Sequence, residues 1–386
     1  MSSAVSIVNV DVYIALKKGS FHRMSQACFT SHLKISQKMT KASTFDRKGR
    51  ATIVDVGRVA GVSDATVSRA LNKPETVSAK TRARIEAAIA ETGYVPNPLA
   101  KAMVSGRTYT IGALVPTLNH SIFSKFLHAL ESDLSDQGYN LVVAVTDADR
   151  DREVEKAKKL LAMGVEGLIV SGLSHNADLL REAARFAVPL IATSYYEPSA
   201  PLPTIGYDNK IVATQALAHL TALGHRRIAV AHGPVAGNDR TRSRIDALAD
   251  PGEGASLTFY ETTLDYAGGA AVVDRLEGPY SALLCLSDVL AVGALFQLRS
   301  LGKRVPEDIS LMGFDDLDAS QFTVPPLSTV RLPIQDMGRV TARAVCDFLD
   351  SGSPIAPRLL EAQVIARAST GAVPLAPGAS DNPRGS

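Results

Sequence analysis

The stretch Ala60–Asn72, AGVSDATVSRALN, places a Gly-Val-Ser turn directly before a short helical pattern. Ser63 is a suitable N-cap for that helix. The apolar residues that follow have the spacing of a buried helix face, and they are Val67, Ala70 and Leu71. A preceding helical pattern stops at Gly61, and a third one runs from residue 78 to 93. These three patterns predict a small all-α head with a helix-turn-helix unit.

Charge is distributed unevenly along the 386 residues. Residues 1–110 hold seventeen Lys or Arg and seven Asp or Glu, a net charge of +10. Residues 111–386 hold 24 basic and 32 acidic side chains, a net charge of −8. A basic N-terminal region joined to an acidic remainder indicates that the N-terminal region meets a polyanion. Together with the helix-turn-helix pattern, this predicts double-stranded DNA as a partner.

After Thr108 the chain alternates apolar strands with amphipathic helices. Near-continuous apolar runs such as YTIGALVP and VEGLIVSG are typical of parallel strands that helices cover on both faces. We expect an α/β core of two doubly wound lobes, with a boundary near residues 201–208 and a final strand and helix that cross back. The sequence holds no GxGxxG, P-loop or GxSxG motif and no evident Ser/His/Asp set, which argues against an enzyme.

The predicted organisation has five parts. We expect a disordered extension at 1–49, the head at 50–95, a hinge helix or linker at 96–107, the core at 108–370 and a mobile tail at 371–386. The sequence lacks a secretory signal and a long uncharged apolar run, so we expect a cytoplasmic protein without a membrane partner. The three cysteines stand far apart without metal-ligand spacing, which predicts no disulfide, no metal and no cofactor.

Several strings resemble the lactose-repressor (LacI/GalR) family of bacterial transcription regulators. They are TIVDVGRVAGVSDATVSRALN, VSAKTRARIEAAIAETGYVPNPLA, IGYDN, LGHRRIAV, MGFDD and PPLSTVRLPIQDMG, and they span residues 51 to about 370. The resemblance implies a DNA-binding head, a hinge helix that folds on the operator, and a core like a periplasmic sugar-binding protein. We therefore expect a repressor that a sugar or sugar acid controls. Because one small head would bind an operator weakly, we also expect a homodimer. The alternative is a solute-binding protein of a transporter, which would need a secretory signal and no head.

The positions that resemble the family's base readers are Asp64, Ala65 and Arg69. Arg69 can donate two hydrogen bonds to guanine, and Ala65 can touch a thymine methyl. Asp64 either accepts from a base amine or serves as a helix-start residue that the dipole favours. Residues suited either to phosphate contact or to helix capping are Thr52, Ser63, Thr66, Ser68, Asn72, Ser78 and Thr81. Also assigned to DNA by resemblance are Tyr94 and the hinge residues Asn97, Ala100 and Met103, with Met103 where the family usually has Leu.

Small ligands bind two-lobed α/β proteins at the carboxyl ends of the strands. By resemblance, Asp208, Asp315 and Arg244 grip the vicinal hydroxyls of a sugar. The alternatives are helix capping for Asp208 and a solvated side chain for Arg244. Ser287 stands where the family usually has Asn. The first lobe is expected to contribute side chains that follow its strands, namely Asn119, Ser121, Phe123 and Tyr195.

Overall fold

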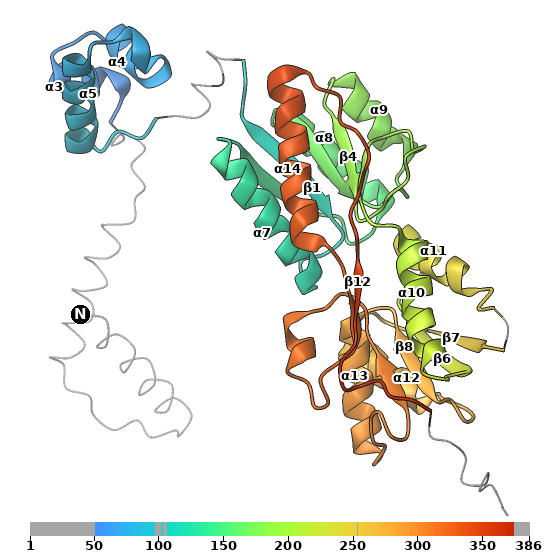
Figure 1. The fold of residues 1–386 in the computed structure, drawn as a ribbon. Coiled ribbons are helices and arrows are strands. Elements are labelled where there is room, and N and C mark those ends of the chain that lie inside the picture. The colour runs from blue at the N-terminus through green and yellow to red at the C-terminus, as the bar shows by residue number, and fades with distance from the viewer. Residues whose placement is uncertain (1–50, 97–101, 103–105, 253, 374–386) are drawn as a thin grey trace, which may run out of the picture. The chain divides into compact units, whose positions relative to one another are not determined.

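The computed structural model describes residues 51–96, 102, 106–252 and 254–373 (Figure 1). The chain divides into two compact units that part between Asn97 and Pro98. Several predictions fall outside the described residues, namely those for the extension at 1–49, for the tail beyond residue 373, and for the hinge residues Asn97, Ala100 and Met103.

The head consists of short helices around a small apolar core. Its elements are α3 (Ile53–Ala60), α4 (Asp64–Asn72), the 3-10 turn η2 (Pro74–Thr76) and α5 (Ala79–Thr92). All three helices contribute to the core, whose buried side chains are Val56, Ala60, Val67, Ala70, Ile85 and Ala88. The predicted helix-turn-helix head is thereby confirmed.

The turn between α3 and α4 depends on two glycines. Gly61 ends α3 with a φ of 62°, a left-handed conformation that favours glycine. A Cβ on Gly57 would lie 2.9 Å from the carbonyl oxygen of Val62, so a side chain there would push the turn open. Arg84 of α5 donates to the carbonyl oxygens of Ala60 and Gly61, which ties the end of α3 to the third helix.

The first lobe of the core is built on a six-stranded parallel sheet in the order β11-β5-β4-β3-β1-β2. Helix α14 lies beside α7 on this lobe, although more than 190 residues separate them in sequence (Figure 1). The elements of the lobe are β1 (Thr110–Val115), α7 (Ser121–Asp136), β2 (Asn140–Val145), α8 (Arg150–Ala162), β3 (Gly167–Ser171), α9 (Ala177–Arg185), β4 (Leu190–Thr193), β5 (Thr204–Gly206), α14 (Ile334–Ser351) and β11 (Arg358–Leu359).

The second lobe has a four-stranded parallel sheet in the order β7-β6-β8-β9. Its elements are α10 (Asn209–Ala222), β6 (Arg227–His232), α11 (Asp239–Leu248), β7 (Ser256–Glu261), α12 (Tyr266–Asp274), β8 (Ala282–Cys285), α13 (Asp288–Ser300), β9 (Ser310–Met312) and the 3-10 turn η3 (Asp318–Gln321). Within the described ranges of both units, no helix combines the length and the apolar composition that crossing a bilayer requires.

The chain passes between the lobes after β5, after β10 (Thr329–Arg331) and before β12 (Gln363–Ile365). Strands β10 and β12 pair antiparallel where they cross. The first crossing lies near the predicted boundary, and α14 and β11 return to the first lobe as expected. The predicted fold class, a helical head followed by two parallel-sheet lobes, is confirmed. The residues of the returning strand β11 were not located from the sequence, and strands β5, β7, β10 and β12 were not predicted.

Candidate functional site

One face of α4 is exposed to solvent and carries the side chains predicted to read bases. The opposite face is buried in the head through Val67 and Ala70. Residues at i, i+1, i+4, i+5 and i+8 share one side of a helix. Here those positions, all exposed except the half-buried Ser68, are Asp64, Ala65, Ser68, Arg69 and Asn72.

Local hydrogen bonds set the conformation of this face. The Asp64 carboxylate accepts from the backbone N–H of Ala65 at 2.8 Å, which fits the helix-start role that the sequence left open. Arg69 Nε donates to the Ala65 carbonyl oxygen at 3.3 Å, so its guanidinium lies along the exposed side of the helix. Asn72 Nδ2 donates to the carbonyl oxygen of Ser68 at 2.9 Å.

The hydroxyl residues of the head take capping positions. Thr52 forms a capping box with Asp55 at the start of α3. Ser63 and Ser78 accept from the backbone N–H groups of Thr66 and Thr81 at the starts of α4 and α5. Capping was one of the two roles left open for these residues, and the Thr52, Ser63 and Ser78 side chains are also exposed. Elsewhere in the head, Tyr94 is half-buried against the core.

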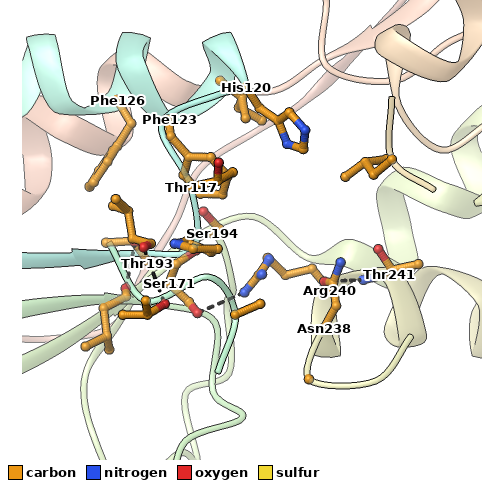
Figure 2. A pocket seen from close by; sticks show the side chains of 18 of the residues that line it. Thr117, His120, Phe123, Phe126, Ser171, Thr193, Ser194, Asn238, Arg240 and Thr241 are labelled. Carbon is orange, nitrogen blue, oxygen red and sulfur yellow. Dashed lines mark hydrogen bonds between the residues drawn. The ribbon is translucent and has the colours of Figure 1, made fainter. Parts of the chain in front are cut away.

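A cavity of about 430 Å³ lies between the two lobes of the core (Figure 2). Its walls include residues directly after strands β1, β2, β3 and β4 of the first lobe and after β6, β8 and β9 of the second. The cavity therefore lies at the carboxyl ends of both parallel sheets, where ligands bind in such folds.

Arg244 of α11 is fixed in the wall of this cavity, with 6% of its surface exposed. Its Nε donates to Asn209 Oδ1 at 3.0 Å, and its Nη1 donates to the carbonyl oxygen of Leu286 at 3.2 Å. Its guanidinium carbon lies 4.0 Å from the centroid of the Phe314 ring. Burial lowers the pKa of Arg244 from its usual value, since removing a charge from water is costly.

Asp315 lies in the same wall and is half-buried. Ser287 Oγ donates to its carboxylate at 3.0 Å. Burial, together with the nearby charge of Asp288, raises the pKa of Asp315 to about 7. Near neutral pH the carboxyl group is therefore present both with and without its proton, so it can donate to or accept from a ligand hydroxyl.

Asp288, the neighbour of Ser287, is fully buried and faces the protein interior. It accepts hydrogen bonds from the backbone N–H of Leu317 at 2.8 Å, from Ser320 Oγ at 2.5 Å and from Thr329 Oγ1 at 2.6 Å. Burial raises its pKa. These contacts hold the loop that carries Asp315, so Asp288 supports the cavity wall.

Polar and aromatic side chains from the first lobe complete the cavity (Figure 2). Ser171 lines the cavity, and its Oγ is buried without a hydrogen-bond partner among the described residues. Phe123 and Phe126 of α7 supply aromatic rings, and His120 precedes that helix.

The structure brings together five of the eight side chains predicted to bind an effector, which are Ser121, Phe123, Arg244, Ser287 and Asp315. The other three, Asn119, Tyr195 and Asp208, are not among the residues that line the cavity. Asp208 is the N-cap of α10 and accepts from the backbone N–H groups of Lys210 and Ile211 at 2.8 and 3.1 Å. This is the capping role that the sequence left open.

Several lining residues were not predicted. They are His120, Asp147, Ser171, Thr193, Ser194, Asn238, Arg240 and Thr241. Ser171 and Thr193 are the last residues of strands β3 and β4, and four others lie in loops that follow strands, namely His120, Asp147, Ser194 and Asn238. A position at or after the carboxyl end of a strand is the sequence signal that could have found these six. Arg240 and Thr241 lie in α11 and have no such signal.

Comparison with known proteins places this geometry in a family. Residues 52–97 match the family described as bacterial regulatory proteins, lacI family, and residues 217–370 match a periplasmic binding protein-like domain. The HTH-type transcriptional repressor CytR of Escherichia coli (strain K12) is 33% identical over 342 residues, which cover 84% of this chain and 97% of CytR. This chain belongs to the lacI family of bacterial regulatory proteins. It is thus a transcription regulator, and the prediction that it is not an enzyme agrees with its relatives.

Solved structures of lacI-family proteins share the fold. The lac repressor dimer bound to operator and the anti-inducer ONPF aligns with a TM-score of 0.76 and 28% identity, over 84% of this chain and all of the repressor chain. The complex of the transcriptional regulator CelR with cellobiose aligns with a TM-score of 0.59 and 29% identity, over 83% of this chain and all of CelR.

Proposed function

We propose that this lacI-family chain is a repressor that binds operator DNA as a homodimer, with an affinity controlled by a sugar or sugar acid in the cavity between the lobes. The observation that carries the ligand half of the proposal is the convergence of Arg244, Asp315, Ser287 and Ser171 on one cavity. The lac repressor dimer on its operator and CelR with cellobiose support the two kinds of partner.

DNA recognition falls to the exposed face of α4. A helix in the major groove needs side chains that reach base edges and a frame that phosphate contacts hold in place. Arg69 is suited to guanine, and the exposed hydroxyls of Ser63 and Ser78 are suited to phosphates. Two heads held in one dimer would read two half-sites, which explains how so small a unit could reach useful affinity.

In the cavity, hydrogen-bond donors and hydrogen-bond acceptors both face the ligand. Arg244 can only donate, Ser171 and Ser287 can donate and accept, and Asp315 can do either according to its protonation. Vicinal hydroxyls of a sugar need this mixture of donors and acceptors. A cavity of about 430 Å³ also lies in the size range typical of small-molecule sites, roughly 300–1,000 Å³.

The coupling follows from the position of the cavity. A ligand that contacts both lobes favours one relative arrangement of the lobes. If the arrangements differ in DNA affinity, the ligand changes how much of the protein is in the one that binds DNA more tightly. The ligand site and the DNA site are thus linked by a coupling free energy. It can be measured as the effect of the ligand on DNA affinity or as the effect of DNA on ligand affinity.

The experiment has two stages. Fluorescence anisotropy should first find fragments from the promoter regions near the protein's own gene that bind much more tightly than random DNA of equal length. A thermal-shift screen of sugars and sugar acids should then give a ligand that changes the Kd for that fragment at least about fivefold, the lower end of typical allosteric coupling. Equal affinity for all fragments would contradict the DNA half of the proposal. A ligand that binds without changing the Kd would contradict the control half.

A further inference from the structure

The start of α11 in the second lobe reaches across the cavity and holds a loop of the first lobe. Asp239 Oδ2 accepts from the backbone N–H of Ser174 at 2.9 Å and also from the N–H of Leu173. The neighbouring Arg240 Nη1 donates to the carbonyl oxygen of Ser171 at 2.9 Å (Figure 2). We call this arrangement the latch, and its parts are Asp239, Arg240 and residues 171–174.

The backbone of the first lobe is shaped to admit these two side chains. Gly172 has a φ of 85°, a conformation that favours glycine. A Cβ on Gly172 would lie 2.2 Å from Arg240 Nη1 and 2.5 Å from Asp239 Oδ1. Any other residue at this position would therefore force the latch open or distort the loop.

The latch is sheltered from solvent. The Asp239 and Arg240 side chains are each 14% exposed, and they pair with each other at 3.2 Å. Hydrogen bonds with one charged partner are about twice as strong as neutral ones, and partial burial reduces their screening.

A second contact between the lobes gives a useful contrast. Lys125 of α7 and Asp318 of η3 form an ion pair at 2.7 Å, but the Asp318 side chain is 83% exposed. Exposed ion pairs of this kind contribute little because water and salt screen them. The latch is therefore the stronger of these two polar links between the lobes.

We propose that the latch holds the two lobes together in the ligand-free protein and that the effector acts on it directly. Arg240 and Ser171 both line the cavity, so a ligand that engages either residue changes the balance of the same hydrogen bonds that join the lobes. The action of the effector on the latch rests on the proposed function, whereas the closing of the lobes by the latch in the ligand-free protein does not.

The test measures the lobe separation in full-length protein without ligand or DNA. Spin labels are attached at Ala184→Cys in α9 and Ala271→Cys in α12, both exposed positions in different lobes. The background carries Cys28→Ser, and the remaining Cys285 and Cys346 are buried. Mixing with excess unlabelled protein keeps distances within one chain dominant, and pulsed electron paramagnetic resonance gives their distribution.

We expect one short-distance population in the parent protein and an added longer-distance population in Asp239→Ala and in Arg240→Gln. Gly172→Ala should give the same added population by a steric route, which keeps the test informative if one variant fails to fold. Lys125→Gln, which removes the exposed ion pair, is the matched control and should leave the distribution unchanged. Folded latch variants with the parent's distribution would overturn the proposal, as would an equal shift in Lys125→Gln. Because no ligand or DNA enters this experiment, its failure is distinguishable from failure of the proposed function.

Discussion

Asn209 joins Arg244 to the opposite lobe. Its Oδ1 accepts from Arg244 Nε at 3.0 Å, and its Nδ2 donates to the carbonyl oxygen of Ser194 at 3.0 Å. Asn209 is 1% exposed, so both bonds are shielded from water. The guanidinium that faces the cavity is thus positioned by a buried amide whose other end is anchored just after β4 of the first lobe.

Arg244→Ala should abolish the response to the effector while leaving operator binding without effector intact. Asn209→Ala should weaken effector binding by about 1–3 kcal/mol, because the buried guanidinium then lacks one of its partners. Calorimetry with the sugar found in the screen measures the effector affinity of each of the two variants. Arg181→Ala, an exposed arginine of α9, is the matched control. Undiminished affinity in Arg244→Ala would show that the ligand binds elsewhere.

Asp208→Ala should affect stability, whereas Asn209→Ala should affect effector binding. Because Asp208 caps α10, its loss should lower the free energy of unfolding by about 1 kcal/mol and leave effector affinity nearly unchanged. Urea unfolding and calorimetry on the same variant separate the two effects. A loss of effector affinity comparable to that of Arg244→Ala would show that Asp208 does bind the effector.

The contrast between residues 208 and 209 shows where prediction from sequence stops. Tyr207 of the motif IGYDN lines the cavity. The next two residues, Asp208 and Asn209, are both polar, and only the start of α10 decides which one turns inward. Arg240 and Ser171 were missed for a related reason. Their roles depend on contacts between residues 69 positions apart, which no local pattern contains.

The fold was more accessible to prediction because it rests on local signals in the sequence. Strands such as β1 and β3 are continuous apolar runs, and helices α3 and α5 of the head begin at capping residues and end at glycines. Strand β11 has only two residues and β12 only three, too few to show any period. They exist because a neighbouring strand pairs with them.

Arg69→Ala should weaken operator binding by about 1–3 kcal/mol and relax the preference for one base pair in each half-site. The reason is that a bidentate contact with guanine discriminates between bases, whereas a phosphate contact does not. Anisotropy titrations on the operator, on operator variants and on random DNA provide the comparison. Equal losses on specific and random DNA would show that Arg69 meets only the phosphate backbone.

Gly57→Ala should destabilise the head, against the usual gain when alanine replaces glycine inside a helix. The new methyl group would lie 2.9 Å from the Val62 carbonyl oxygen and press on the turn before α4. We expect weaker operator binding with an unchanged effector affinity, since the core is a separate unit. Val59→Ala, at an exposed position of the same helix, is the control. Operator binding by Gly57→Ala equal to that of the parent would mean that the turn tolerates the added methyl.

Asp315 should make stability fall as pH rises. Burial, with the charge of Asp288, raises its pKa to about 7 in the folded protein, whereas an unfolded chain releases this proton near pH 4. Between these values the folded state holds a proton that the unfolded state has lost, so the contribution is complete below about pH 4 and is lost as pH rises through about 7. Asp315→Asn cannot ionise, so relative to the parent it should gain about 1–3 kcal/mol between pH 5 and pH 8. Urea unfolding at both pH values measures this change, with the exposed Asp250→Asn as control. A stability difference between Asp315→Asn and parent that stays constant over this range would mean that Asp315 is already ionised at pH 5.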